Sequence, residues 1–103
     1  MKIVKQRKVV AEEIEIPDGT YYFRKHGSEF FKITLEQDEE ITDCVYESVE
    51  DYSDSFGIQI EKYSTDEMSF RVTSKFLDCS TYSPIMEEEF NKAKLEVIGR
   101  ITK

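Results

Sequence analysis

The chain is poor in the residues that build metal sites and disulfide frameworks. Its 103 residues include only two cysteines, Cys44 and Cys79, and a single histidine, His26. Small secreted domains usually carry several spaced cysteines, and zinc sites use close pairs such as C-x-x-C. Neither pattern occurs, so we expect reduced thiols, a cytoplasmic location, no metal and no other cofactor.

Long apolar runs are also missing. No stretch approaches the ~18 apolar residues that a membrane-spanning helix needs, so we expect no membrane partner. The basic segment Met1–Val10 is followed by acidic residues rather than by an apolar core, so we expect no signal peptide. With four glycines, two prolines and no repeat or low-complexity linker, the chain is predicted to be a single domain spanning residues 1–103.

The chain nevertheless contains enough apolar material for a core. Six tyrosines and seven phenylalanines are interleaved with charged residues, which make up 35 % of the chain. A disordered chain lacks such an apolar share. A domain of this size buries about two-thirds of the surface that its unfolded form exposes. We therefore expect a folded domain.

The N-terminal third predicts a first strand over Lys8–Ile16, which is rich in β-branched residues. Pro17–Gly19 ends this strand, because proline fixes φ and Asp-Gly favours a tight turn. The cations that precede it favour a protected sheet edge over a phosphate-binding tail, since four positive charges on an acidic protein bind nucleic acid weakly.

A hairpin is predicted next, from two aromatic and β-branched runs, Thr20–Lys25 and Glu29–Leu35, on either side of a glycine-containing turn. The register of this hairpin is left open by the sequence. One choice places Arg24 opposite Glu29 and Phe23 opposite Phe30, which pairs opposite charges and two aromatic rings.

A second hairpin is predicted from two alternating runs, Phe56–Glu61 and Met68–Phe76. A slip of one residue would turn one whole apolar set toward water. A five-residue loop over residues 63–67 avoids this slip by pairing Ile60 with Phe70 and Ile58 with Val72.

The C-terminal segment predicts a helix that begins at Ser83 and Pro84, a good N-cap followed by a proline at the first helical position. Acidic residues cluster early and basic residues late, as the helix dipole favours. One face carries Met86, Phe90, Ala93 and Val97. The fold class is therefore predicted to be α+β, with an antiparallel sheet of about five strands built from hairpins and a C-terminal helix packed on one face.

The segment near 39–52 supports two interpretations. As a helix it gathers Ile41, Val45 and Val49 on one face and its acids on the opposite face. As a strand it puts carboxylates beside apolar side chains, although its β-branched residues prefer strands. The periodicity predicts a second helix near 39–52. The alternative strand would add a member to the sheet and would need a solvent-exposed acidic face.

Acidic residues are concentrated in this same region. Ten of the 22 acids lie between Lys32 and Lys62, a window without a single basic residue, and the net charge of the chain is −8. Such a charge repels nucleic acid, so we expect no direct nucleic-acid partner. The predicted partner-binding residues are Asp38, Glu39, Glu40, Asp43, Glu47, Glu50, Asp51 and Asp54.

No catalytic site is predicted. His26 lies at a predicted hairpin tip, and no local signature pairs it with a nucleophilic cysteine. General acid–base catalysis needs a carboxylic acid whose pKa is raised by burial, whereas the acids here cluster in polar surroundings. Asp51–Gly57 is the nearest approach to a cation loop, but Phe56 and Lys62 occupy the positions where an EF-hand requires glycine and glutamate.

No resemblance to a known family emerges from these residues, so function is inferred from physical chemistry. The leading hypothesis is a non-catalytic binding or regulatory domain that engages a basic protein surface, in one variant by mimicking nucleic-acid charge. The competing interpretation is a solvated face that only keeps the protein soluble.

Two hypotheses of other classes remain. One is a structural or homo-oligomerising subunit that associates through a sheet edge or an aromatic face, because the doublets Tyr21-Tyr22 and Phe30-Phe31 put an aromatic ring on both faces of their strands. The other is an enzyme of unknown type, which would require a deep pocket that converges on His26 or on buried carboxylates.

Overall fold

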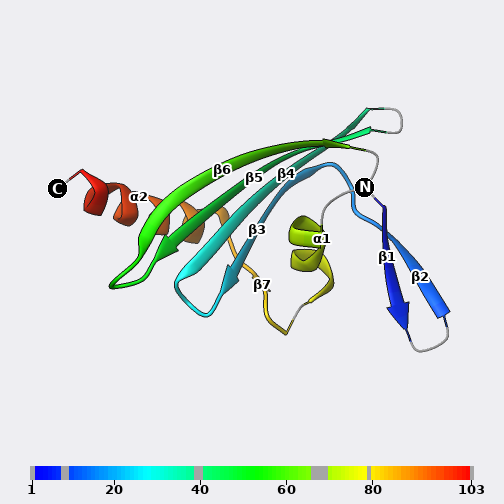
Figure 1. Ribbon diagram of the computed structural model, residues 1–103, viewed down its shortest axis with the longest axis horizontal. Helices are drawn as coiled ribbons and strands as arrows, with labels where there is room; N and C mark the ends of the chain where they lie inside the picture. Colours follow the sequence, from blue (N-terminus) through cyan, green and yellow to red (C-terminus); the bar gives the residue numbers. More distant parts are fainter. Residues whose placement is uncertain (1, 8–9, 39–40, 66–69, 79, 103) are drawn as a thin grey trace.

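The computed structural model describes residues 2–7, 10–38, 41–65, 70–78 and 80–102. Its elements are β1 (Lys2–Arg7), β2 (Val10–Glu15), β3 (Gly19–Lys25), β4 (Glu29–Asp38), β5 (Ile41–Asp51), β6 (Phe56–Thr65), α1 (Phe70–Leu77), β7 (Ser83–Pro84) and α2 (Glu87–Ile101). An antiparallel sheet has the strand order β6-β5-β4-β3-β7, and α2 packs on one of its faces (Figure 1). The predicted α+β class, sheet and C-terminal helix are confirmed.

The N-terminal strands form a separate antiparallel ribbon, in which β1 pairs with β2 (Figure 1). The strand predicted over Lys8–Ile16 is confirmed from Val10 to Glu15, and residues 8–9 lie outside the described residues. Neither of the described helices is long and apolar enough to span a membrane.

The β3–β4 hairpin is confirmed, and the register, which the sequence left open, differs by one residue from the choice that places Arg24 opposite Glu29. Lys25 pairs with Glu29 and Phe23 with Phe31, around a turn in which His26 and Gly27 have φ values of 55° and 83°. Directly opposed residues share a face of a sheet. The observed register therefore puts Phe23 and Phe31 into one core, where both are buried.

The helix predicted near 39–52 is wrong, because Ile41–Asp51 is the strand β5, which lies between β4 and β6 in the sheet. The sheet is covered on both faces, so β5 buries Cys44 and Tyr46 on one face and Val49 on the other. A strand that is apolar on both faces loses the simple alternation from which strands are recognised. Its β-branched composition was the more reliable signal here. Residues 39–40 lie outside the described residues.

The second predicted hairpin is also wrong. Phe56–Thr65 is a strand, but it pairs with β5, so that Ile58 lies opposite Val49 and Ile60 opposite Glu47. Phe70–Leu77 is the helix α1 rather than a returning strand. Val72 and Phe76 are four residues apart, a spacing that suits one face of a helix as well as one face of a strand. Part of the predicted loop, residues 66–67, lies outside the described residues.

The C-terminal helix begins later than predicted. Ser83 and Pro84 are extended and pair with β3, and the helix starts at Glu87 with Met86 as its N-cap residue. Proline is tolerated at a sheet edge because its missing N–H faces away from the ladder. The predicted acidic first turn of α2 is present.

Two apolar cores lie on opposite faces of the sheet. On one face, Val72 of α1 packs against a cluster that includes Phe31 of β4. On the other face, α2 packs Phe90, Ala93 and Val97 against a cluster that includes Phe30 of β4. Successive residues of a strand point to opposite faces. The molecule therefore has three layers, α1, the sheet and α2.

Candidate functional site

Helix α2 covers only part of its face of the sheet. It packs against the half of β4, β5 and β6 that contains Phe30, Val49 and Ile58. Toward the β4–β5 turn the same face continues without a covering helix among the described residues. We call this region the open face; its members, which share the face by register, are Thr34, Glu36, Asp38, Ile41, Asp43, Val45, Ile60 and Lys62.

The open face exposes apolar side chains. Ile41 is 49 % exposed, Val45 39 % and Ile60 58 %. They come from neighbouring strands and alternate with charged residues along β5 and β6. Contiguous exposed apolar side chains with a polar rim are typical of interaction surfaces.

Carboxylates surround these side chains. Glu36 lies directly opposite Asp43 across the β4–β5 ladder, and Asp38 lies opposite Ile41. All three acids are exposed, and within the described residues none of them forms an ion pair. Like charges in directly opposed positions destabilise a strand pair, so the open face carries an unrelieved repulsion.

The opposed pair Glu29 and Glu50 offers a contrast. These two acids also face each other across the β4–β5 ladder. Here, however, the Lys25 ammonium lies 4.0 Å from a Glu29 carboxylate oxygen. A cation next to opposed carboxylates reduces their repulsion. The open face has Lys62 on the neighbouring strand, but among the described residues Lys62 forms no ion pair with Glu36 or Asp43.

Two predicted site residues are used internally instead. Glu47 is only 7 % exposed, and its carboxylate accepts a hydrogen bond of 2.9 Å from Lys94 of α2. Asp51 accepts a hydrogen bond of 2.5 Å from Arg100 of α2. These contacts fasten α2 to β5, and each of the two carboxylates already has a cation of α2 as its partner.

The remaining predicted residues are divided between the two ends of the sheet. Asp38 and Asp43 lie together on the open face, whereas Glu50 and Asp54 are exposed near the β5–β6 turn. Eight residues of extended chain, about 26 Å, separate Asp43 from Asp51. Glu39 and Glu40 lie outside the described residues. The structure thus gathers part of the predicted set and adds Glu36 to it.

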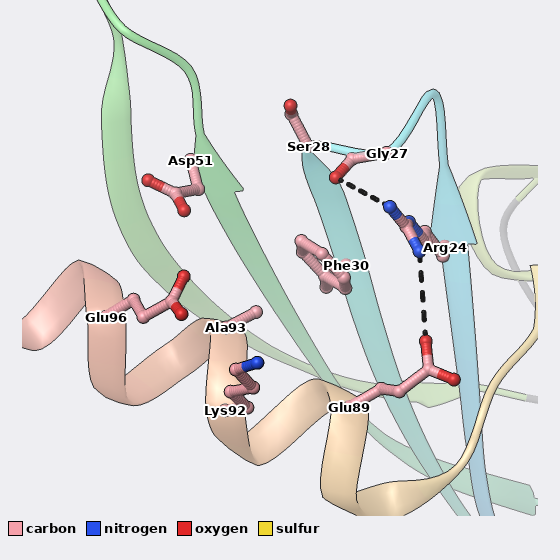
Figure 2. A pocket seen from close by; sticks show the side chains of 9 residues that line it. All are labelled: Arg24, Gly27, Ser28, Phe30, Asp51, Glu89, Lys92, Ala93 and Glu96. Carbon is pink, nitrogen blue, oxygen red and sulfur yellow. Dashed lines mark hydrogen bonds and ion pairs between the residues drawn. The ribbon is translucent and has the colours of Figure 1, made fainter.

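A cavity of about 310 Å³ opens between the β3–β4 turn and α2 (Figure 2). Arg24 reaches into it, donates a hydrogen bond of 3.3 Å to the Gly27 carbonyl and lies 3.9 Å from Glu89. Its guanidinium also stacks 5.5 Å from the centre of the Phe30 ring. The charged residues that line this cavity are of both signs, and two of them, Arg24 and Glu89, form an ion pair with each other.

The histidine and the described cysteine lie in different environments. His26 is exposed in the β3–β4 turn, whereas Cys44 is buried in the core on the α1 side. Burial raises the pKa of the Cys44 thiol to about 11, which keeps it protonated and weakly nucleophilic at neutral pH. Cys79 lies outside the described residues.

The segment Asp51–Gly57 is shaped as a turn rather than as a cation loop. The Tyr52 N–H donates a hydrogen bond of 2.9 Å to the Ser55 carbonyl, and the Arg100 guanidinium donates a hydrogen bond to the Asp51 carboxylate. Among the described residues, no group of three or more His, Cys, Asp or Glu side chains is arranged to hold a metal ion.

A buried lysine on the other face of the sheet was not predicted from the sequence. Lys75 of α1 is buried, and its ammonium lies 4.6 Å, 5.4 Å and 4.5 Å from the ring centres of Phe31, Tyr46 and Tyr82. Cation–π attraction of this kind compensates part of the cost of burying the charge. The available signal was the position of Lys75 one turn after Val72, on the inner side of α1.

Comparisons of the chain with models of protein families, with curated proteins and with solved structures give no match.

Proposed function

We propose that this protein is a non-catalytic interaction domain whose open face binds a basic, amphipathic surface of another protein. The observation that carries the proposal is the opposition of Glu36 and Asp43, neither of which forms an ion pair among the described residues, beside the exposed side chains of Ile41 and Val45. A partner cation would relieve the repulsion, and partner apolar groups would cover the aliphatic side chains.

The free energies of the two kinds of contact indicate that the partner must supply both cations and apolar groups. An exposed ion pair contributes only about 0–1 kcal/mol. Fully burying a valine or isoleucine side chain contributes about 1.5–3 kcal/mol. The aliphatic side chains therefore provide most of the affinity, while the carboxylates and the net charge of −8 speed encounter and fix orientation. This division favours an amphipathic partner over pure mimicry of nucleic-acid charge.

The proposal is tested by titrating the isotope-labelled chain with a synthetic amphipathic helix of about 18 residues that carries leucines on one face and lysines elsewhere. Amide shifts are expected at Ile41–Val45 and weaker binding at higher salt. A matched peptide with glutamates in place of the lysines should not bind. Shifts confined to other regions of the sheet would reject the open face as the site.

The variant Asp43→Lys separates function from stability. It should weaken peptide binding by about tenfold, yet raise the free energy of unfolding by about 0.2–1 kcal/mol, because Glu36 then faces an opposite charge. Asp54→Lys, with the same charge change near the β5–β6 turn, is the control and should leave affinity within about twofold. Equal losses in both variants would show that only net charge matters.

A further inference from the structure

The two edges of the five-stranded sheet differ. Beside β3, the short strand β7 pairs with Phe23 and Arg24, and the Ile85 N–H donates to the Tyr22 carbonyl at 3.1 Å. At the opposite edge, β6 pairs with β5 along its whole length without a bulge, and no described strand pairs with its outer side (Figure 1).

Natural edge strands are usually protected from further pairing. Common devices are proline, a bulge, a very short strand, charged side chains or a covering element. β6 runs from Phe56 to Thr65, contains no proline and exposes Ile60 at its centre. Its two charged residues, Glu61 and Lys62, are adjacent and of opposite sign, and the first half of the strand is uncharged. The edge is therefore a long, regular template for another strand.

We propose that the outer edge of β6 pairs antiparallel with β6 of a second copy of this chain, with Ile60 of both copies on the twofold axis. The interface is isologous, as in most homodimers. It joins the two sheets into one continuous sheet and is independent of the acids on the open face.

The register follows from charge and overlap. Directly opposed residues share a face, so the axis must pass through a residue position. An axis at Glu61 or Lys62 would set like charges directly opposite each other, which is unfavourable. An axis at Gln59 would pair only Phe56 to Lys62, whereas an axis at Ile60 pairs the strand from Phe56 to Ser64.

The chosen register also gives compatible neighbours. The two Ile60 side chains, each 58 % exposed in the single chain, would cover each other. Gly57 would lie opposite Tyr63 of the second copy, an arrangement in which an aromatic ring shields an edge glycine. Lys62 would extend its aliphatic stem along Ile58 of the second copy while keeping its ammonium in water.

We expect added salt to change the affinity of dimerisation and the affinity for a basic partner in opposite directions. Each copy carries a net charge of −8, so the copies repel each other at long range. Screening this repulsion should strengthen dimerisation as salt increases, whereas it weakens binding of a basic partner. The two proposals can therefore fail independently.

The first test is sedimentation equilibrium of the full chain at low and moderate salt. We expect a monomer–dimer equilibrium that shifts toward dimer as salt rises. Ile60→Lys, which puts two cations on the axis, should weaken dimerisation by about tenfold or more. At a protein concentration where both chains are monomeric its thermal midpoint should be unchanged, because the side chain is exposed. A monomeric mass at every concentration and both salt levels would overturn the proposal.

The second test fixes the register by disulfide formation. In an Ile60→Cys variant the two thiols would be directly opposed, at a Cβ separation of about 4.5–5.5 Å, close enough to form a disulfide under mild oxidation. Ile58→Cys, on the same strand and face, is the control and should remain uncrosslinked, as should the parent chain with its two native cysteines. Crosslinking through residue 58 rather than 60, or a dimer that persists in Ile60→Lys, would also overturn the proposal.

Discussion

Glu47 shows how a single burial changes the role of a predicted binding residue. The nearest acids in the sequence, Asp43 and Glu50, are exposed, yet the Glu47 carboxylate lies beneath α2 and accepts hydrogen bonds of 2.9 Å and 3.3 Å from the Lys94 ammonium. A buried carboxylate is costly unless a cation and hydrogen bonds satisfy it. Lys94 is therefore a structural requirement rather than a surface charge.

We predict that Lys94→Ala lowers the free energy of unfolding by about 1–2 kcal/mol, a value below that of a fully buried pair because the Lys94 side chain is partly exposed. Lys92→Ala, on an exposed face of the same helix, should change it by less than about 0.5 kcal/mol. Urea denaturation compares the two variants. Equal effects would mean that the Glu47–Lys94 contact contributes no specific stability.

Cys44 gives a pH dependence of defined sign. Burial raises its thiol pKa from the usual value of 9.0 to about 11. Between these values the unfolded chain loses the thiol proton while the folded chain retains it, so the stabilising contribution is complete below pH 9 and decreases as pH rises toward 11.

We therefore predict that the stability advantage of the parent chain over Cys44→Ala shrinks as pH rises from about 8 to about 11. Urea denaturation of both proteins across this range measures the difference. Tyrosine ionisation contributes to both proteins, including Tyr22, whose pKa is raised by burial and then by Glu87, so it cancels in the comparison. A constant difference would contradict the prediction.

At the scale of elements, α2 is held by fewer residues than its apolar stripe suggests. Phe90, Ala93 and Val97 are buried, whereas Met86, the first member of the predicted stripe, is 67 % exposed. The helix begins only at Glu87, so Met86 lies at its N-cap rather than on its packed face.

Truncation of the first two members of the predicted stripe should therefore have very different effects on stability. We predict that Phe90→Ala lowers the free energy of unfolding by about 3–5 kcal/mol. Met86→Ala should lower it by less than about 0.5 kcal/mol. Chemical denaturation followed by circular dichroism measures both. A large effect of Met86→Ala would contradict the observed start of the helix.

Local sequence signals determined some elements and failed for others. The turn at His26–Ser28 and the stripe of α2 were sufficient to predict a hairpin and a helix. For β5 they failed, because coverage on both faces puts apolar residues at odd and even positions. For α1 they failed, because its apolar residues fit either period. Both failures result from packing between distant segments.

The candidate site was predictable only in part for a related reason. Clustering of acids identified Asp38 and Asp43, which share the open face. The sequence could not show that Glu47 would be neutralised, because its partner Lys94 is 47 positions away. The exposure of Ile41 and Val45 depends on where α2 ends its cover of the sheet, which is also a tertiary property.

At the scale of the whole molecule, the two cores beneath the helices share one strand. β4 contributes Phe30 to the core beneath α2 and the next residue, Phe31, to the core beneath α1. Removing either helix would expose one face of β4 to water, while the other face of β4 still packs against the remaining helix. The two cores are thereby linked through β4, and we expect the five-stranded body to unfold in a single cooperative transition, despite having no one centre around which all its apolar groups assemble.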